Sequence, residues 1–139
     1  MTIRRGETWG VPAPPPAGMV VLRDGIAVHE WVLDHRRKGI AVPPFGLAGG
    51  DLARTVAGGS ADQFSVGATL ISLDLVRVTA GEMVTWSTAH VVARRSWWTG
   101  EVVLVMTAQF LGTADVTPRG HPNDGKADVL RVDPAMRRR

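Results

Sequence analysis

The hydrophobic pattern of this chain changes its period in mid-sequence, and this change limits the possible folds more than any other feature. Between residues 26 and 38 apolar side chains recur at helical spacing, whereas Ile71, Leu73 and Leu75 alternate with their neighbours at strand spacing. Residues 101–111 are a near-continuous apolar run, which is typical of a strand buried on both faces. The pattern predicts an α+β fold, in which a short βαβ-like segment precedes a mainly antiparallel β-sandwich.

One domain with an N-terminal arm is the organisation expected from 139 residues, of which 45% are hydrophobic. Residues 1–18 should form an extended arm, because the prolines between 12 and 16 exclude a helix or a central strand. Residues 19–139 should form the single domain. It divides into a reduced α/β segment at 19–59 and the β-sandwich at 68–133.

Turn and cap residues mark the expected elements. The α/β segment should contain strand 19–22, helix 26–38, strand 40–42 and helix 51–57. Asp24 and Asp51 stand just before the two helices and are expected N-caps, and glycines follow both helices. The second half should contain strands over 68–76, 83–93, 101–111, 115–117 and 127–132, with a bend inside the third and a turn at Ala80-Gly81.

Composition narrows the function classes. The chain has no cysteine, which argues against a disulfide framework, a thiolate zinc site and a cysteine nucleophile. Its apolar runs are shorter than the roughly 20 residues of a membrane-spanning helix, and no signal core follows Met1. We therefore expect a cytoplasmic protein, with peripheral association at the inner membrane face as a further expectation.

Basic residues occur in clusters, although the formal net charge is only +3. The clusters are His35-Arg36-Arg37-Lys38, Arg94-Arg95 and Arg137-Arg138-Arg139. Such clusters attract phosphates or an anionic membrane surface, but more often they are simply solvated. No basic helix or extended aromatic-basic pattern accompanies them, so nucleic acid is not an expected partner.

Glycines run directly into a predicted helix start between Gly46 and Thr55. Gly49 and Gly50 would let the backbone approach a ligand, and the N–H groups of a helix start favour an anion such as phosphate. An ordinary capped turn explains Asp51 equally well. The spacing alone leaves both interpretations open.

Two further carboxylates stand in positions that suit chemistry. Asp74 lies among apolar residues of a predicted strand, where an acid needs a hydrated metal, backbone N–H groups or an ion pair with Arg54 or Arg77. Asp124 follows Asn123 and precedes Gly125 in a loop, where it can bind magnesium or accept a hydroxyl proton. A hairpin turn is the alternative for Asp124.

A histidine and an arginine-tryptophan cluster complete the candidates. Arg94 and Arg95 stand beside Trp97 and Trp98, which suits phosphate contact with stacking, or an interfacial anchor. The tryptophans equally suit the closed end of a sandwich. His90 is expected to be a hydrogen-bonded core or edge residue that shares a strand face with Trp86, rather than a ligand.

Three motifs, in their order along the chain, resemble the diacylglycerol kinase family of bacterial lipid kinases. They are Gly49-Gly50-Asp51-Leu52-Ala53-Arg54-Thr55, which resembles a Gly-Thr-Gly-Asn-Asp-Leu-Ala-Arg-type loop, Ser72-Leu73-Asp74-Leu75, and the Asp-Gly loop within 118–128. The resemblance covers roughly residues 40–133. It departs at Arg23-Asp24-Gly25-Ile26, where family members have a Gly-Gly-Asp-Gly-Thr loop that cradles the nucleotide.

The resemblance implies transfer of phosphate from ATP to a lipid hydroxyl with magnesium assistance. Carried over by position, Asp51 and Asp74 would hold magnesium, and Asp124 would be the candidate base. The expected phosphate-binding residues are Gly49, Gly50, Arg54, Arg94 and Arg95. Two classes stay open: a reduced lipid kinase, or a non-catalytic phosphate- or lipid-binding module that lacks the nucleotide site or takes it from a partner chain. A homo-oligomer is compatible with either class.

Overall fold

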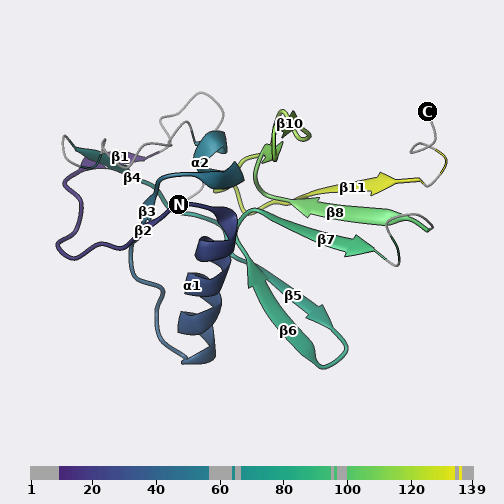
Figure 1. Ribbon diagram of the computed structural model, residues 1–139, viewed down its shortest axis with the longest axis horizontal. Coiled ribbons are helices and arrows are strands. Elements are labelled where there is room, and N and C mark those ends of the chain that lie inside the picture. Colours follow the sequence, from purple (N-terminus) through teal and green to yellow (C-terminus); the bar gives the residue numbers. More distant parts are fainter. Residues whose placement is uncertain are drawn as a thin grey trace.

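The computed structural model describes residues 10–56, 64, 67–94, 96, 100–133 and 135. Its elements in chain order are β1 (Val11–Ala13), β2 (Val21–Leu22), α1 (Gly25–Arg37), β3 (Gly46–Leu47), α2 (Gly50–Thr55), β4 (Ala68–Leu70), β5 (Val76–Ala80), β6 (Met83–Ser87), β7 (His90–Arg94), β8 (Val102–Met106), β9 (Phe110–Leu111), β10 (Ala114–Asp115) and β11 (Asp128–Val132). Small sheets, mostly antiparallel, stand beside helices α1 and α2 (Figure 1). This arrangement confirms the predicted α+β class.

A parallel strand pair, β2 and β3, begins the fold, and each of its strands leads into a helix. The N–H of Gly46 donates to the Val20 carbonyl and the N–H of Ala48 to the Leu22 carbonyl, both at 2.9 Å. Because both strands run the same way, the loops before α1 and α2 leave from one edge of the pair. The order strand, helix, strand, helix is the one that the sequence predicts.

The predicted position of the second strand is wrong. Residues 40–42 have no regular structure, and the strand lies at Gly46–Leu47, inside a segment that the sequence suggests is a loop. Proline has no backbone N–H, so Pro43 and Pro44 cannot donate to a neighbouring strand. After this proline pair, Gly46 donates its N–H to the Val20 carbonyl, immediately before β2.

Helix α1 begins and ends as predicted, to within one residue. Asp24 is its N-cap, and its side chain accepts a hydrogen bond from the N–H of Ala27 at 2.8 Å. Gly39 follows the helix with a φ of +68°, a conformation that glycine adopts without strain. Val28 and Val32 face inward and pack with Leu22 in one of two core clusters.

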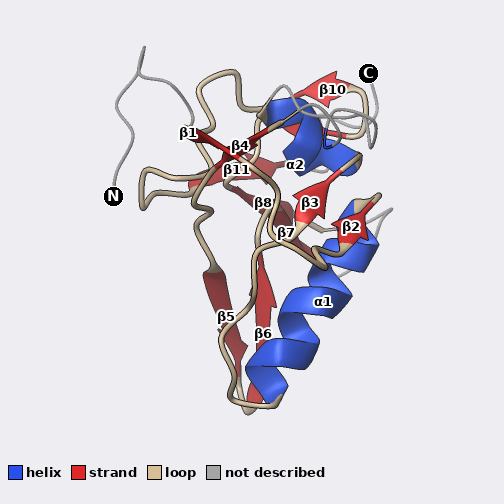
Figure 2. Cartoon of the chain, turned by 90° about the vertical axis from the view of Figure 1, so that its left-hand side faces the viewer, coloured by secondary structure: helices blue, strands red, loops and turns tan. Residues whose placement is uncertain are grey.

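The β-rich half centres on an antiparallel sheet in the order β11–β8–β7. Val102, Leu104 and Met106 alternate along β8 and point into the second core cluster, against Leu111 and Val116 among others. The β5–β6 hairpin is separate from this sheet and packs along α1 (Figure 2). The single strand predicted over 101–111, with a bend inside it, is wrong: β8 ends at Met106, and β9 begins at Phe110 in a different sheet.

The single strand predicted over 83–93 is wrong. Strand β6 ends at Ser87, and β7 begins at His90 in a different sheet. The chain turns at Thr88 and Ala89, where the carbonyl of Ala89 accepts hydrogen bonds from the N–H groups of Thr107 and Ala108 at 2.8 and 3.1 Å. These bonds draw the chain away from the hairpin and start its pairing with β8.

Within the described ranges, neither helix is long and apolar enough to cross a membrane.

Candidate functional site

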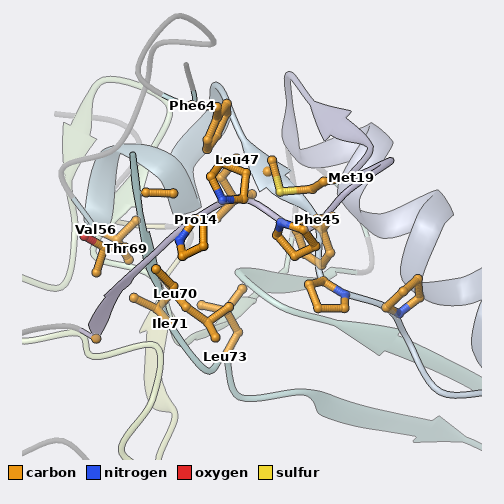
Figure 3. Close-up of a pocket in the computed structure, with 18 of the residues that line it drawn as sticks. Pro14, Met19, Phe45, Leu47, Val56, Phe64, Thr69, Leu70, Ile71 and Leu73 are labelled. Carbon is orange, nitrogen blue, oxygen red and sulfur yellow. The ribbon is translucent and has the colours of Figure 1, made fainter. Parts of the chain in front are cut away.

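An open apolar cavity lies between the N-terminal arm and the segment that follows β4. Its volume is about 1020 Å³, at the upper end of the roughly 300–1000 Å³ that small-molecule sites usually occupy. None of the described residues that line it carries a charge, and only Thr69 and Thr88 bring polar side chains. Figure 3 shows Pro14, Phe45, Leu47, Ile71 and Leu73 around one common space.

The proline-rich arm forms one wall of this cavity. Strand β1 pairs antiparallel with β4, which sets Val11 opposite Leu70. Contact at the start of the arm is close, because a Cβ added at Gly10 would stand 2.0 Å from the Leu70 carbonyl oxygen. Pro14, Pro15 and Pro16 follow and line the cavity. The arm that the sequence predicts as extended is therefore attached to the body of the protein along its described part.

The first predicted phosphate loop packs against the chain itself. A Cβ added at Gly49 would stand 2.2 Å from the carbonyl oxygen of Arg23, and one added at Gly50 would stand 2.9 Å from the backbone nitrogen of Gly25. Gly50 also has a φ of +85°. The loops before α1 and α2 therefore touch each other backbone to backbone.

Asp51 is not the N-cap of α2, so that prediction is wrong. The cap is Gly49, which makes no side-chain bond, and Asp51 lies inside the first turn. The positive φ of Gly50 turns the chain into the helix one residue earlier than the acid. The Asp51 carboxylate therefore does not cap its own helix. Its Oδ1 instead accepts a hydrogen bond from the N–H of Gly112 at 2.9 Å, 61 residues along the chain.

His90 and Arg54 approach the same carboxylate. The Nδ1 atom of His90 lies 3.8 Å from Asp51 Oδ2, and Nη1 of Arg54 lies 4.0 Å from Oδ1. The Asp51 side chain is only 19% exposed. The predicted strand face shared with Trp86 is wrong, because the turn at residues 88 and 89 puts His90 in β7, in a different sheet from Trp86 of β6. The sequence does not reveal the approach of His90 to Asp51 for the same reason.

Asp74 and the Asp124 loop come together. The backbone N–H of Asp74 donates to the Pro122 carbonyl at 2.7 Å, and its Oδ2 accepts from the N–H of Gly125 at 2.8 Å. Asp124 Oδ1 accepts from the N–H of Lys126 at 2.9 Å. Asp74 is thus satisfied by backbone rather than by the predicted arginine partners, and Asp124 makes the local bond of a tight turn.

The cavity and the Asp124 loop meet at one short segment. Leu73 and Leu75 line the cavity, while Asp74 between them bonds to the loop at 122–125. The strand predicted over 68–76 is wrong beyond Leu70, because residues 71–75 lie between β4 and β5 and belong to no strand. The Asp74 carboxylate is bonded to the loop and does not line the cavity.

The remaining predicted residues lie elsewhere. Arg94 ends β7, about 13 Å from His90 at about 3.3 Å per residue. Arg95, Trp97 and Trp98 lie outside the described residues. Among the described side chains, no three of the His, Cys, Asp and Glu types are grouped so that they could hold a metal ion.

Comparison with known proteins found no matching family model, no matching curated protein and no matching solved structure.

The contact between Asp51 and Gly112 makes a prediction for stability. Asp51→Ala removes the acceptor for the Gly112 N–H and should lower the free energy of unfolding by about 1 kcal/mol. Asp51→Asn keeps an acceptor oxygen and should lose less than half as much. Urea denaturation of the three proteins measures both values. Equal losses in the two variants would show that the hydrogen bond is not what Asp51 contributes.

Proposed function

We propose that this chain is a lipid-binding module, a reduced relative of bacterial lipid kinases, whose ligand lies in the apolar cavity. The observation that carries the proposal is the cavity itself, a space of about 1020 Å³ with no charged group among its described lining residues. Transfer of apolar surface from water into such a space is favourable. A phosphate, sugar or nucleotide would lose its hydration there without gaining charged partners.

Two polar side chains of the cavity support a ligand with a polar end. An acyl chain would contact Leu73 and Leu75, and a hydroxyl of the head group would hydrogen-bond to Thr69 or Thr88, the residues with hydroxyl side chains among the described lining. A mono- or diacylated glycerol has this combination of an apolar body and a neutral, hydroxyl-bearing head. The proposed setting is the cytoplasm, at the inner face of the membrane.

The packing of the glycine loop favours a module without nucleotide chemistry. The backbone of Arg23 and Asp24 occupies the space where side chains at Gly49 and Gly50 would stand. The fold itself therefore requires small residues at these positions. Asp24 adds a carboxylate at the N-terminus of α1, where a nucleotide phosphate would otherwise be attracted. Both features disfavour phosphate binding at the N-termini of α1 and α2.

The arrangement of the second half supports the kinship that we propose. The inner face of the β11–β8–β7 sheet packs on Leu111 of β9 and on Val116, which follows β10. We propose that this sheet and the β9–β10 pair are the two layers of a reduced β-sandwich. Its layers would be small, because the pair contributes only two residues from each strand.

A lipid kinase is the second candidate, and the joining of Asp74 to the Asp124 loop favours it. In that case Asp124 would accept the proton of the lipid hydroxyl. Magnesium usually takes one or two carboxylates and completes its shell with water and phosphate oxygens; Asp74, beside the Asp124 loop, would be its carboxylate, whereas Asp51 meets Gly112 and His90 instead. Bound magnesium would supply charge neutralisation for the transferred phosphate.

Titration with a short-chain diacylglycerol tests the proposed function. We expect saturable binding, followed by the fluorescence of a displaced fatty-acid probe. Leu70→Glu places a charge at the cavity lining and should weaken binding by about tenfold or more. Leu70 is 54% exposed, so its replacement should leave the fold intact.

The matched control is Val129→Glu. Val129 is also an aliphatic strand residue, 61% exposed, and it does not line the cavity. The affinity of the Val129→Glu variant for the diacylglycerol should equal that of the unaltered protein. Equal weakening in both variants, or no saturable binding in the unaltered protein, would contradict the lipid site. Phosphorylation of the diacylglycerol in the presence of ATP and magnesium would show that the protein is a lipid kinase rather than a non-catalytic binding module.

A further inference from the structure

One end of the molecule combines exposed apolar side chains with arginines. The last turn of α1 and the β5–β6 turn both lie at the lower end of the fold in two perpendicular views (Figures 1 and 2). We call this region the basic end. Its residues are Arg36, Arg37, Lys38, Ile40, Met83 and Val84.

Large aliphatic side chains at the basic end face solvent. Ile40 is 50% exposed, Met83 59% and Val84 42%. Single exposed aliphatic residues are ordinary on protein surfaces. Here Ile40 follows the end of α1, and Met83 and Val84 begin β6 next to the β5–β6 turn, so they can enter a surface without moving the core. Apolar side chains beside basic ones are the combination that inserts at a lipid headgroup boundary.

Contacts within the fold hold part of the positive charge in place. The guanidinium carbon of Arg36 lies 4.4 Å from the centre of the Trp86 ring, which fixes it against β6. Trp86 thus places an arginine of α1 against the β5–β6 hairpin.

Carboxylates at the basic end compensate only part of its charge. The Lys38 ammonium donates to Asp34 at 2.7 Å, and this hydrogen bond holds the pKa of Asp34 below its usual range. That pair is therefore neutral overall at physiological pH. Glu82 at the β5–β6 turn then opposes two arginines, Arg36 and Arg37. The basic end keeps an excess of positive charge.

We propose that the basic end docks on an anionic lipid bilayer. Ile40, Met83 and Val84 enter the headgroup region, and the arginines contact lipid phosphates. The proposal goes beyond ligand binding in the cavity, because the two surfaces share no residue among those described. Charge complementarity selects this partner: a bilayer offers many phosphates in one plane beside an apolar interior, which matches arginines beside aliphatic side chains.

Co-sedimentation with vesicles tests the docking surface. Vesicles with about one-third phosphatidylglycerol in phosphatidylcholine should bind the protein at least about tenfold more tightly than phosphatidylcholine alone. The double variant Arg36→Glu, Arg37→Glu should lose about tenfold or more of the binding to anionic vesicles. Met83→Asp should lose binding severalfold, because the β5–β6 turn would no longer insert.

The matched control is Ile26→Asp. Ile26 is 72% exposed in the first turn of α1, at the opposite end of that helix, and its replacement should not change vesicle binding. An equal loss in Ile26→Asp, or equal binding to both kinds of vesicle, would overturn the proposal. Leu70→Glu should also bind vesicles normally. If it loses vesicle binding while the basic-end variants keep theirs, the cavity captures membrane lipid and the docking proposal fails, although the proposed function survives.

Discussion

Met106→Ala should lower the free energy of unfolding by about 2–5 kcal/mol, one of the largest effects expected for a single substitution in this chain. Met106 is completely buried, and it lies in β8, the central strand of the β11–β8–β7 sheet. Truncation would remove its transfer free energy and leave a cavity that the small core cannot close. Chemical denaturation followed by tryptophan fluorescence measures the loss.

Two further variants keep this prediction testable if Met106→Ala does not fold. Met106→Leu preserves most of the volume and should cost less than about 1.5 kcal/mol. Val129→Ala, on the exposed edge strand of the same sheet, should change stability by no more than about 0.5 kcal/mol. A large loss at Val129 or none at Met106 would mean that the core lies elsewhere.

Gly49→Ala should destabilise the protein by about 1–3 kcal/mol, as overpacking does in well-packed sites. The φ of Gly49 is close to 180°, which alanine also adopts, so the cost comes from contact alone. The new Cβ would stand 2.2 Å from the Arg23 carbonyl oxygen, which is backbone and cannot turn aside. The loops before α1 and α2 would have to separate.

Gly25→Ala is the matched control for this contact. It replaces the glycine that begins α1, next to the loop contact, and its Cβ would meet no neighbouring part of the chain within 4 Å. Alanine is a better helix former, so stability should stay equal or rise slightly. Thermal unfolding of both variants provides the comparison. If Gly49→Ala is as stable as the unaltered protein, the glycine is free to contact a ligand, and the case for a lost nucleotide site weakens.

Local signals predicted the first helix of this fold well. The carboxylate of Asp24 and the positive φ of Gly39 act within one turn of α1, and both are visible in the sequence. For α1 the deciding interactions are made by near neighbours. The length of the apolar run 101–111 exceeds a usual strand, but the place where it is interrupted depends on hydrogen bonds from Thr107 and Ala108 to the distant Ala89 carbonyl.

Features set by distant contacts were not predictable. Ala89 accepts its hydrogen bonds from Thr107 and Ala108, so nothing near Ala89 shows that the strand over 83–93 is interrupted. Asp51 is of a residue type that often caps helices, yet its side chain accepts a hydrogen bond from Gly112, 61 residues away. The parallel strand at 46–47 has only two residues and no hydrophobic period.

The candidate site also combines residues that are visible as sequence motifs with contacts that only the fold creates. Asp74 and the Asp124 loop are each visible as motifs, but their mutual hydrogen bonds depend on the path of the chain between them. No sequence motif predicts the apolar cavity. It arises where the proline arm crosses the segment after β4, and its lining residues are individually ordinary.

Methyl NMR of the methionine-labelled protein tests the lipid cavity most directly. Three of the five methionines fall in described positions that report different regions: Met19 lines the cavity, Met83 lies at the basic end and Met106 in the core. Addition of a monomeric short-chain diacylglycerol should shift the Met19 methyl resonance saturably and leave those of Met83 and Met106 in place. Saturable binding that leaves the Met19 resonance unmoved would contradict the account.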